Sequence, residues 1–161
     1  MAKVSDVEVV EFPKCKVIGL REKGSYAKIR EMIPKLCTYM ISKNIKFAGF
    51  PIFVCHENSN EEAFKADKDG AADLEICIPI EEAVRSEGEF KVYDLPRYKM
   101  AKITRTGPYV ECEDVWKKLH TWMAENNYKV VGNTREVYLN NPVETKESEL
   151  ITEIYTPIGT H

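Results

Sequence analysis

The turn Gly24-Ser25-Tyr26 recurs 83 positions later as Gly107-Pro108-Tyr109, and this repetition decides the fold that the sequence predicts. The same offset relates two further pairs, Pro13 with Pro96 and Gly49 with Gly132. Self-similarity at a fixed distance is typical of a duplicated structural unit. We therefore expect a single domain made of two repeats, one over residues 7–80 and one over residues 90–158.

Each repeat shows the pattern of a strand, a helix and two further strands. Apolar residues at helical spacing predict helices over residues 26–43 and 110–126, and Pro34 predicts a kink or break in the first near Ile33. The polar run 58–73 is expected to be a loop. Opening strands are expected over residues 7–12 and then 15–22 in the first half, and over 90–94 and then 98–106 in the second. Paired strands are expected over 50–56 with 73–79 and over 134–139 with 150–156.

These elements predict an α+β fold. Its β-α-β-β unit is duplicated, its sheets are antiparallel, and a pseudo-twofold axis relates the halves. Pockets favour interfaces between such units, so a ligand groove is expected between the two halves.

Two Glu-x-Tyr pairs in the last two strands are the strongest candidates for a site. Alternation places Glu136 and Tyr138 on one face of their strand, and Glu153 and Tyr155 on one face of the next. Antiparallel pairing would bring these faces side by side. Carboxylates among phenol rings suit an organic cation, or a carboxyl with a raised pKa for acid–base chemistry. The structural alternative is a half-exposed strand whose polar face has no function.

Further candidates for lining the site are aromatic. Trp116 and Trp122 lie six residues apart on one predicted helix, so both cannot lie at the centre of its apolar stripe. Tyr109 follows a turn glycine at the start of that helix, and at the repeat offset Phe53 corresponds to Glu136. Polar chemistry would then come from the second half and apolar packing from the first.

Composition excludes several classes of protein. Lys plus Arg total 23 and Asp plus Glu 26, and this net charge of −3 argues against direct nucleic-acid binding. The apolar runs are too short to span a membrane, and no signal peptide is visible. Five cysteines without CxxC spacing suggest reduced thiols in the cytoplasm, and three scattered histidines argue against a metal site.

The order of the motifs resembles the GyrI-like, or bacterial effector-binding, domain from about Val7 to Ile158. The resemblance rests on Gly107-Pro108-Tyr109, Trp116-x-x-Leu119-x-x-Trp122, Gly132-x-x-x-Glu136-x-Tyr138-x-x-x-Pro142 and Thr152-Glu153-Ile154-Tyr155-x-Pro157-Ile158. It implies that a glutamate matching Glu136 faces bulky, often cationic aromatic ligands. Aromatic residues at positions such as Tyr138, Tyr155 and the helix tryptophans would line the pocket.

The resemblance also implies what to expect of partners and cofactors. No helix-turn-helix precedes the domain here, since only Met1 to Asp6 lies before it, so we expect a stand-alone member that does not bind DNA. Some stand-alone members hydrolyse cyclopropane-bearing DNA-alkylating compounds, and others protect gyrase. The haem-binding SOUL proteins share the architecture, but no histidine here lies in a plausible axial position, so no cofactor is expected.

Three hypotheses follow. The first is a cytoplasmic binding module that sequesters bulky aromatic or cationic small molecules, with Glu136 supplying charge. The second is a hydrolase in which the Glu136 carboxylate activates water against a strained electrophile. The third is a modulator of gyrase or of another protein, such as a regulator.

Overall fold

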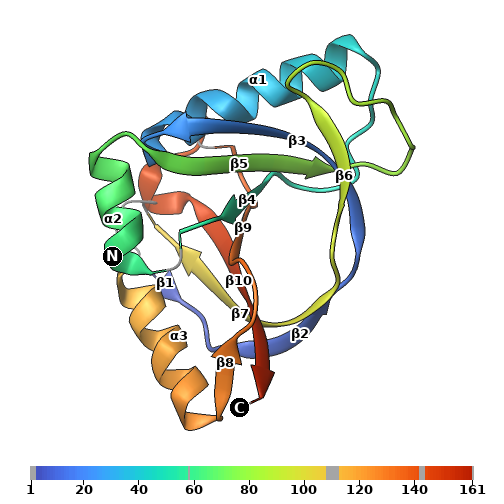
Figure 1. Ribbon diagram of the computed structural model, residues 1–161. Helices are drawn as coiled ribbons and strands as arrows, with labels where there is room; N and C mark the ends of the chain where they lie inside the picture. The colour runs from blue at the N-terminus through green and yellow to red at the C-terminus, as the bar shows by residue number, and fades with distance from the viewer. Residues whose placement is uncertain (1–2, 58, 108–112, 142–143, 161) are drawn as a thin grey trace. The chain divides into compact units, whose positions relative to one another are not determined.

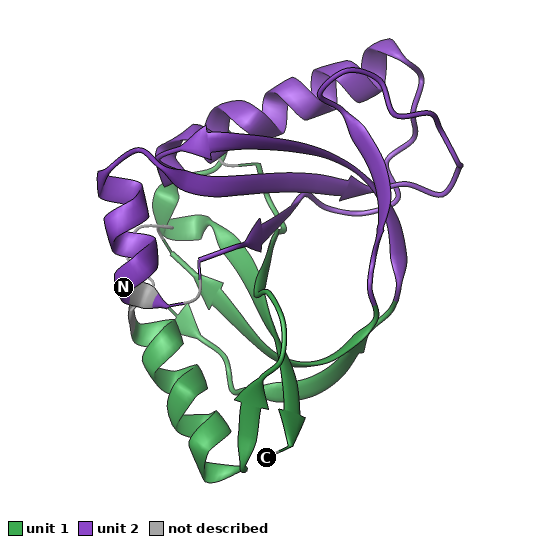
Figure 2. Ribbon diagram, viewed as in Figure 1, with its two compact units in different colours: residues 1–13, 97–161 green, residues 14–96 purple. Residues whose placement is uncertain are grey.

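The computed structural model describes residues 3–57, 59–107, 113–141 and 144–160 (Figure 1). The chain divides into two compact units, residues 14–96 and residues 1–13 with 97–161 (Figure 2). Helices and antiparallel strands occur in each unit, which confirms the α+β fold class. Among the described helices, none has both the length and the apolar composition that crossing a membrane requires.

The unit of residues 14–96 contains one sheet with α1 packed on it. Strand β5 pairs antiparallel with β3 and β4, and β6 pairs with the other edge of β3. The elements are β3 (Cys15–Gly24), the 3-10 helix η1 (Tyr26–Lys28), α1 (Ile29–Ser42), β4 (Ile52–Cys55), α2 (Asn60–Lys68), β5 (Ala72–Pro79) and β6 (Lys91–Leu95).

Helix α1 is continuous through Pro34, so of the kink or break expected near Ile33 the break is wrong, and the kink stays a prediction. Proline removes one backbone donor, but Ile33 and Leu36 are buried on either side of it. Their packing against the sheet stabilises the helix more than local propensity does. Residues 58–73, expected to be a loop, contain helix α2, so that expectation is wrong. The Ser59 hydroxyl caps the first turn of α2 by accepting a hydrogen bond from the Glu62 amide at 3.1 Å.

The second unit has α3 packed on one face of a sheet in which β10 is central. Strand β10 pairs antiparallel with β7 and β9, and its end pairs with β8, while β1 and β2 pair with β7. The elements are β1 (Lys3–Val4), β2 (Glu8–Phe12), β7 (Tyr98–Thr106), α3 (Glu113–Glu125), β8 (Tyr128–Val130), β9 (Arg135–Tyr138), the 3-10 helix η2 (Glu147–Glu149) and β10 (Ile151–Thr160).

The apolar stripe predicted for the second helix forms the core of this unit. Val115, Leu119 and Met123 of α3 are buried at helical spacing. They pack in two clusters with Ala101, Ile103, Ile154 and Ile158 of the sheet, and Trp116 contacts both clusters.

Neither opening strand pairs within its own half of the sequence. Strand β2 pairs with β7, and β6 pairs with β3, so the chain passes between units at Pro13 and again at Pro96. The residue before a proline favours extended backbone, which suits a chain that continues instead of turning back. The superposition of the two halves, and therefore the duplication itself, stays a prediction.

Candidate functional site

Strands β9 and β10 pair antiparallel, as the sequence predicts, and their register fixes which side chains share a face. Glu136 lies opposite Ile154, and directly opposed residues point to the same face of a sheet. Because side chains alternate along each strand, Glu153 and Tyr155 point to the other face. The expectation that the two Glu-x-Tyr faces lie side by side is therefore wrong.

The face that carries Glu136 is the one that α3 covers. Its neighbour Ile154 forms a buried cluster with Ile103 of β7 and Val115 of α3. Trp116 is partly buried and packs against this cluster. Tyr138 shares the face, since it lies opposite Thr152, and is 4% exposed. Three predicted ligand residues, Glu136, Tyr138 and Trp116, thus belong to one side of one sheet.

The Glu136 carboxyl is partly buried in this apolar setting. Burial raises its pKa to about 7, while the positive charge of Arg105 acts in the opposite direction. Among the described residues, none donates a hydrogen bond to the Glu136 carboxylate. A carboxyl near neutral pKa can hold a cation when ionised, or exchange a proton during a reaction.

Arg105 lies on the same face, one cross-strand row away. It is opposite Thr152, whose other neighbour is Tyr138, and it is only 2% exposed. Its Nε lies 3.3 Å from Asp114 Oδ1 in the first turn of α3. A buried guanidinium with a carboxylate beside it is therefore part of the electrostatic environment of Glu136.

On the opposite face, the second Glu-x-Tyr pair is engaged by a lysine. Lys102 Nζ lies 2.9 Å from Glu153 Oε2, and the Tyr155 hydroxyl donates to Glu153 Oε1 at 3.0 Å. Burial, with Glu153 nearby, raises the pKa of Tyr155 to about 12. The Tyr155 ring also meets Phe12 edge-on at 5.0 Å. These contacts occupy the polar groups that the sequence assigns to a ligand.

The remaining predicted ligand residues are Phe53 and Tyr109. Phe53 belongs to β4 in the unit of residues 14–96, where it is 2% exposed and meets Tyr26 edge-on at 5.9 Å. Tyr109 lies outside the described residues, as does Cys112.

A buried polar cluster in the unit of residues 14–96 is organised around Glu75. His56 Nε2 lies 2.6 Å from Glu75 Oε1, and the Tyr93 hydroxyl donates to Glu75 Oε2. Burial opposes ionisation of Glu75, but the hydrogen bonds from His56 and Tyr93 outweigh it and lower its pKa. Burial also raises the pKa of Tyr93 far above its usual range. At an offset of 78 residues Glu75 corresponds to Glu153, and this match is the one sequence signal that could have indicated the position.

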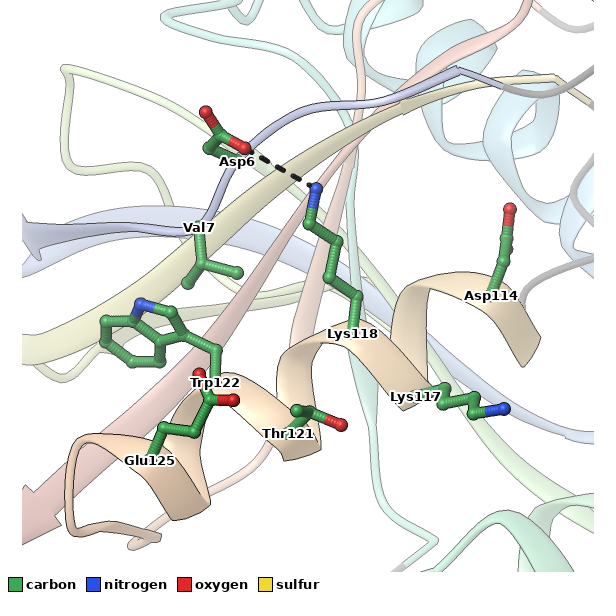
Figure 3. A pocket seen from close by; sticks show the side chains of 8 residues that line it. All are labelled: Asp6, Val7, Asp114, Lys117, Lys118, Thr121, Trp122 and Glu125. Atoms are coloured by element: carbon green, nitrogen blue, oxygen red, sulfur yellow. Dashed lines mark ion pairs between the residues drawn. The ribbon is translucent and has the colours of Figure 1, made fainter.

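A hollow of about 620 Å³ lies on the outer side of α3 (Figure 3). Its apolar surface comes from Val7 and Trp122, and Lys118 reaches across to Asp6 at 3.6 Å. Trp122 stacks on Tyr128 with ring centroids 5.4 Å apart. Of the aromatic candidates from the sequence, Trp122 lines this hollow, whereas Glu136, Tyr138, Glu153, Tyr155 and Trp116 do not. Within the described part of the chain, no three His, Cys, Asp or Glu side chains gather as a metal site.

The chain belongs to the GyrI-like small molecule binding domain family, whose model matches residues 5–159. This membership confirms the resemblance drawn from the motifs. No curated protein sequence matches the chain.

Solved structures show the same fold. The crystal structure of the EcmrR C-terminal domain has a TM-score of 0.84 and 19% identity, over 97% of this chain and 98% of that one. A hydrolase encoded by lin2189 from Listeria innocua has a TM-score of 0.69 and 14% identity, over 96% and 92%. SAV2435 bound to tetraphenylphosphonium has a TM-score of 0.61 and 13% identity, over 96% and 94%.

At these identities the likeness establishes the fold alone. The chain spans 58% of the EcmrR chain solved in a complex with DNA, with a TM-score of 0.83 and 18% identity over 99% of this chain.

Proposed function

We propose that this chain binds bulky aromatic cations and that the Glu136 carboxylate supplies the attracting charge. The observation that carries the proposal is the position of Glu136: partly buried, on the α3 face of the sheet, opposite Ile154 in an apolar cluster that Trp116 joins. A partly desolvated carboxylate beside aromatic surface attracts an organic cation by charge and by cation–π contact. Tetraphenylphosphonium, the ligand in the SAV2435 structure, is such a cation.

Tyr138 and Trp116 would provide the stacking surface of this site. The proposal leaves out Glu153 and Tyr155, because they point to the opposite face and contact Lys102. Phe53 and Tyr109 stay predictions from the sequence and are not part of this proposal.

The test is a titration with tetraphenylphosphonium of wild type, Glu136→Gln and Glu153→Gln. Glutamine keeps the shape of glutamate and removes its charge. Loss of a charge contact should weaken Glu136→Gln by roughly 1–3 kcal/mol, about one to two orders of magnitude in Kd. Glu153→Gln removes the same charge from the other face and should bind as wild type does. If both variants lose the same affinity for tetraphenylphosphonium, or if neither loses any, Glu136 is not the residue that attracts the cation.

Thermal melts of the same proteins give a second, independent readout. The melting temperature of Glu136→Gln should stay level or rise, because a poorly solvated charge has been removed. Glu153→Gln should melt lower, since it loses its ion pair with Lys102. If Glu136 were purely structural, Glu136→Gln would lower the melting temperature and leave the binding of tetraphenylphosphonium unchanged.

A hydrolase is the second candidate, and the raised pKa of Glu136 favours it. A carboxyl with a pKa of about 7 is suited to general acid–base catalysis at neutral pH. In opening an electrophilic cyclopropane, a water oxygen would bond to a ring carbon while the strained C–C bond breaks. The electron pair would pass to a conjugated carbonyl and the water proton to Glu136. Saturable loss of substrate absorbance, abolished in Glu136→Gln, would establish this activity.

We also propose that the protein acts in the cytoplasm and sequesters its ligand. The four described cysteines, Cys15, Cys37, Cys55 and Cys77, form no disulfide with one another, which supports a reducing compartment. A gyrase partner rests on the family resemblance alone. A supercoiling assay with purified gyrase tests it: unchanged supercoiling at saturating protein would exclude it.

A further inference from the structure

Arg105 and Glu136 occupy adjacent rows of the sheet beneath α3. One row runs across three strands through Arg105, Thr152 and Tyr138. The next row runs through Ile103, Ile154 and Glu136. Rows on one face are two residues apart, about 7 Å along a strand. A long arginine side chain covers such a distance, so its charge acts on Glu136 across an apolar surface.

The other charged and titratable groups on the elements of this face are few. Strand β9 carries Tyr138, β7 also carries the exposed Lys99, and β10 presents Thr152, Ile154, Thr156 and Ile158. From α3, His120 is exposed and meets the Trp116 ring at 6.4 Å, and Asp114 contacts Arg105. Arg105 is therefore the buried charge of this face, and Asp114 is one of the groups that oppose it.

Asp114 connects this buried charge with the outer side of the helix. Its Oδ1 lies 3.3 Å from the Arg105 Nε and also accepts from the Val115 amide at 2.8 Å. Yet its side chain is 46% exposed and lines one end of the hollow over α3 (Figure 3). Asp114 is therefore accessible to solvent, but a change in its charge alters the electrostatic field of a guanidinium that is almost fully buried.

We propose that Asp114 is a positioning residue for the Glu136 site: through its ion pair with Arg105 it sets how readily the Glu136 carboxyl ionises. The proposal rests on the proposed function, because the ionised carboxylate is what would hold a cation. With Asp114 charged, the field of Arg105 at Glu136 is partly cancelled. With Asp114 neutral, less of that field is cancelled, and the guanidinium favours the Glu136 carboxylate more strongly. Removing the charge of Asp114 should therefore lower the pKa of Glu136.

The direct test is an NMR titration of protein labelled with ¹³C at the glutamate carboxyl. The Glu136 signal is identified by its absence from Glu136→Gln. In Asp114→Asn, which keeps the shape and an acceptor for the Val115 amide, the midpoint of Glu136 should fall by roughly half to one pH unit. An unchanged midpoint would overturn the proposal.

Glu125→Gln is the matched control, because it removes a carboxylate from the same helix and the same hollow (Figure 3). Glu125 lies eleven residues from Asp114, about 16 Å along α3, beyond the screening length at physiological salt. The titration midpoint of Glu136 in the Glu125→Gln variant should therefore match that in wild type. An equal shift in both variants would mean a general charge effect, and the proposal would be wrong.

Binding separates this proposal from the function on which it rests. One pH unit below the wild-type midpoint, Asp114→Asn should bind tetraphenylphosphonium roughly three- to five-fold more tightly than wild type, because more of its Glu136 is ionised. One and a half units above the midpoint the two should bind alike. A lowered midpoint without any binding would contradict the proposed function and support the role of Asp114. If Asp114→Asn binds tetraphenylphosphonium more weakly at both pH values and the Glu136 midpoint is unchanged, Asp114 has only a structural role.

Discussion

Gly19 lies beneath the Tyr93 ring, and a side chain at this position would displace the phenol. A Cβ on Gly19 would collide with the Tyr93 hydroxyl, which donates to the buried Glu75 carboxylate. Gly19→Ala should therefore lower the free energy of unfolding by about 2–4 kcal/mol, through overpacking and loss of a charge-assisted hydrogen bond. Urea denaturation measures this. In the control Gly24→Ala, the only close contact of the new Cβ is the flexible Lys28 Cδ at 2.9 Å, and its other neighbours lie at ordinary contact distances of 3.7 and 3.9 Å. A comparable loss there would refute the explanation.

The Glu75 cluster predicts how stability depends on pH. The pKa of the Glu75 carboxyl is lowered in the folded state. The stability that this carboxyl contributes is therefore fully present above its pKa in the unfolded chain, about 4.3. That stability is lost as the pH falls through the lowered folded-state pKa. Glu75→Gln should cost about 1.5–3 kcal/mol near neutral pH, and the gap from wild type should narrow in acid. Unfolding free energies at several pH values check this, with the exposed Glu89→Gln as control; a gap independent of pH would contradict it.

Helix ends were predictable because their chemistry is local. Asn44 and Asn127, which follow α1 and α3, adopt left-handed backbone with φ of 56° and 59°. Asparagine tolerates this conformation better than alanine does, and glycine tolerates it best. Asn127→Ala should therefore destabilise the protein by about 1 kcal/mol, whereas Asn127→Gly should not. Thermal unfolding of the two variants measures the difference, and equal melting temperatures would argue against the cap.

Other elements show what local patterns omit. Alternation places the strands around Glu136 and Glu153, but their register depends on how the connecting residues turn. Local patterns therefore do not reveal that the two carboxylates point apart. The partner of β2 is a strand nearly 90 residues away in sequence, which alternation does not reveal either. By contrast, Ser59 and Glu62 form a visible S-x-x-E capping signal, from which α2 could have been predicted.

At the scale of the whole molecule, the cysteine pattern gives a simple prediction. We expect all five cysteines to be reduced, because a chain of 161 residues can form a core without disulfides. Titration of thiols in unfolded protein that was never reduced should count five. A count of three or one would indicate a disulfide and an oxidising compartment.

The central claim is that a ligand lies on the α3 face of the sheet and is held by Glu136. The most direct measurement is a crystal structure of the protein with tetraphenylphosphonium. We expect phenyl groups in contact with Trp116 and Tyr138, and the Glu136 carboxylate as the charged group nearest to phosphorus. A ligand beside Glu153 and Tyr155 on the opposite face, or in the hollow beside Trp122, would contradict it.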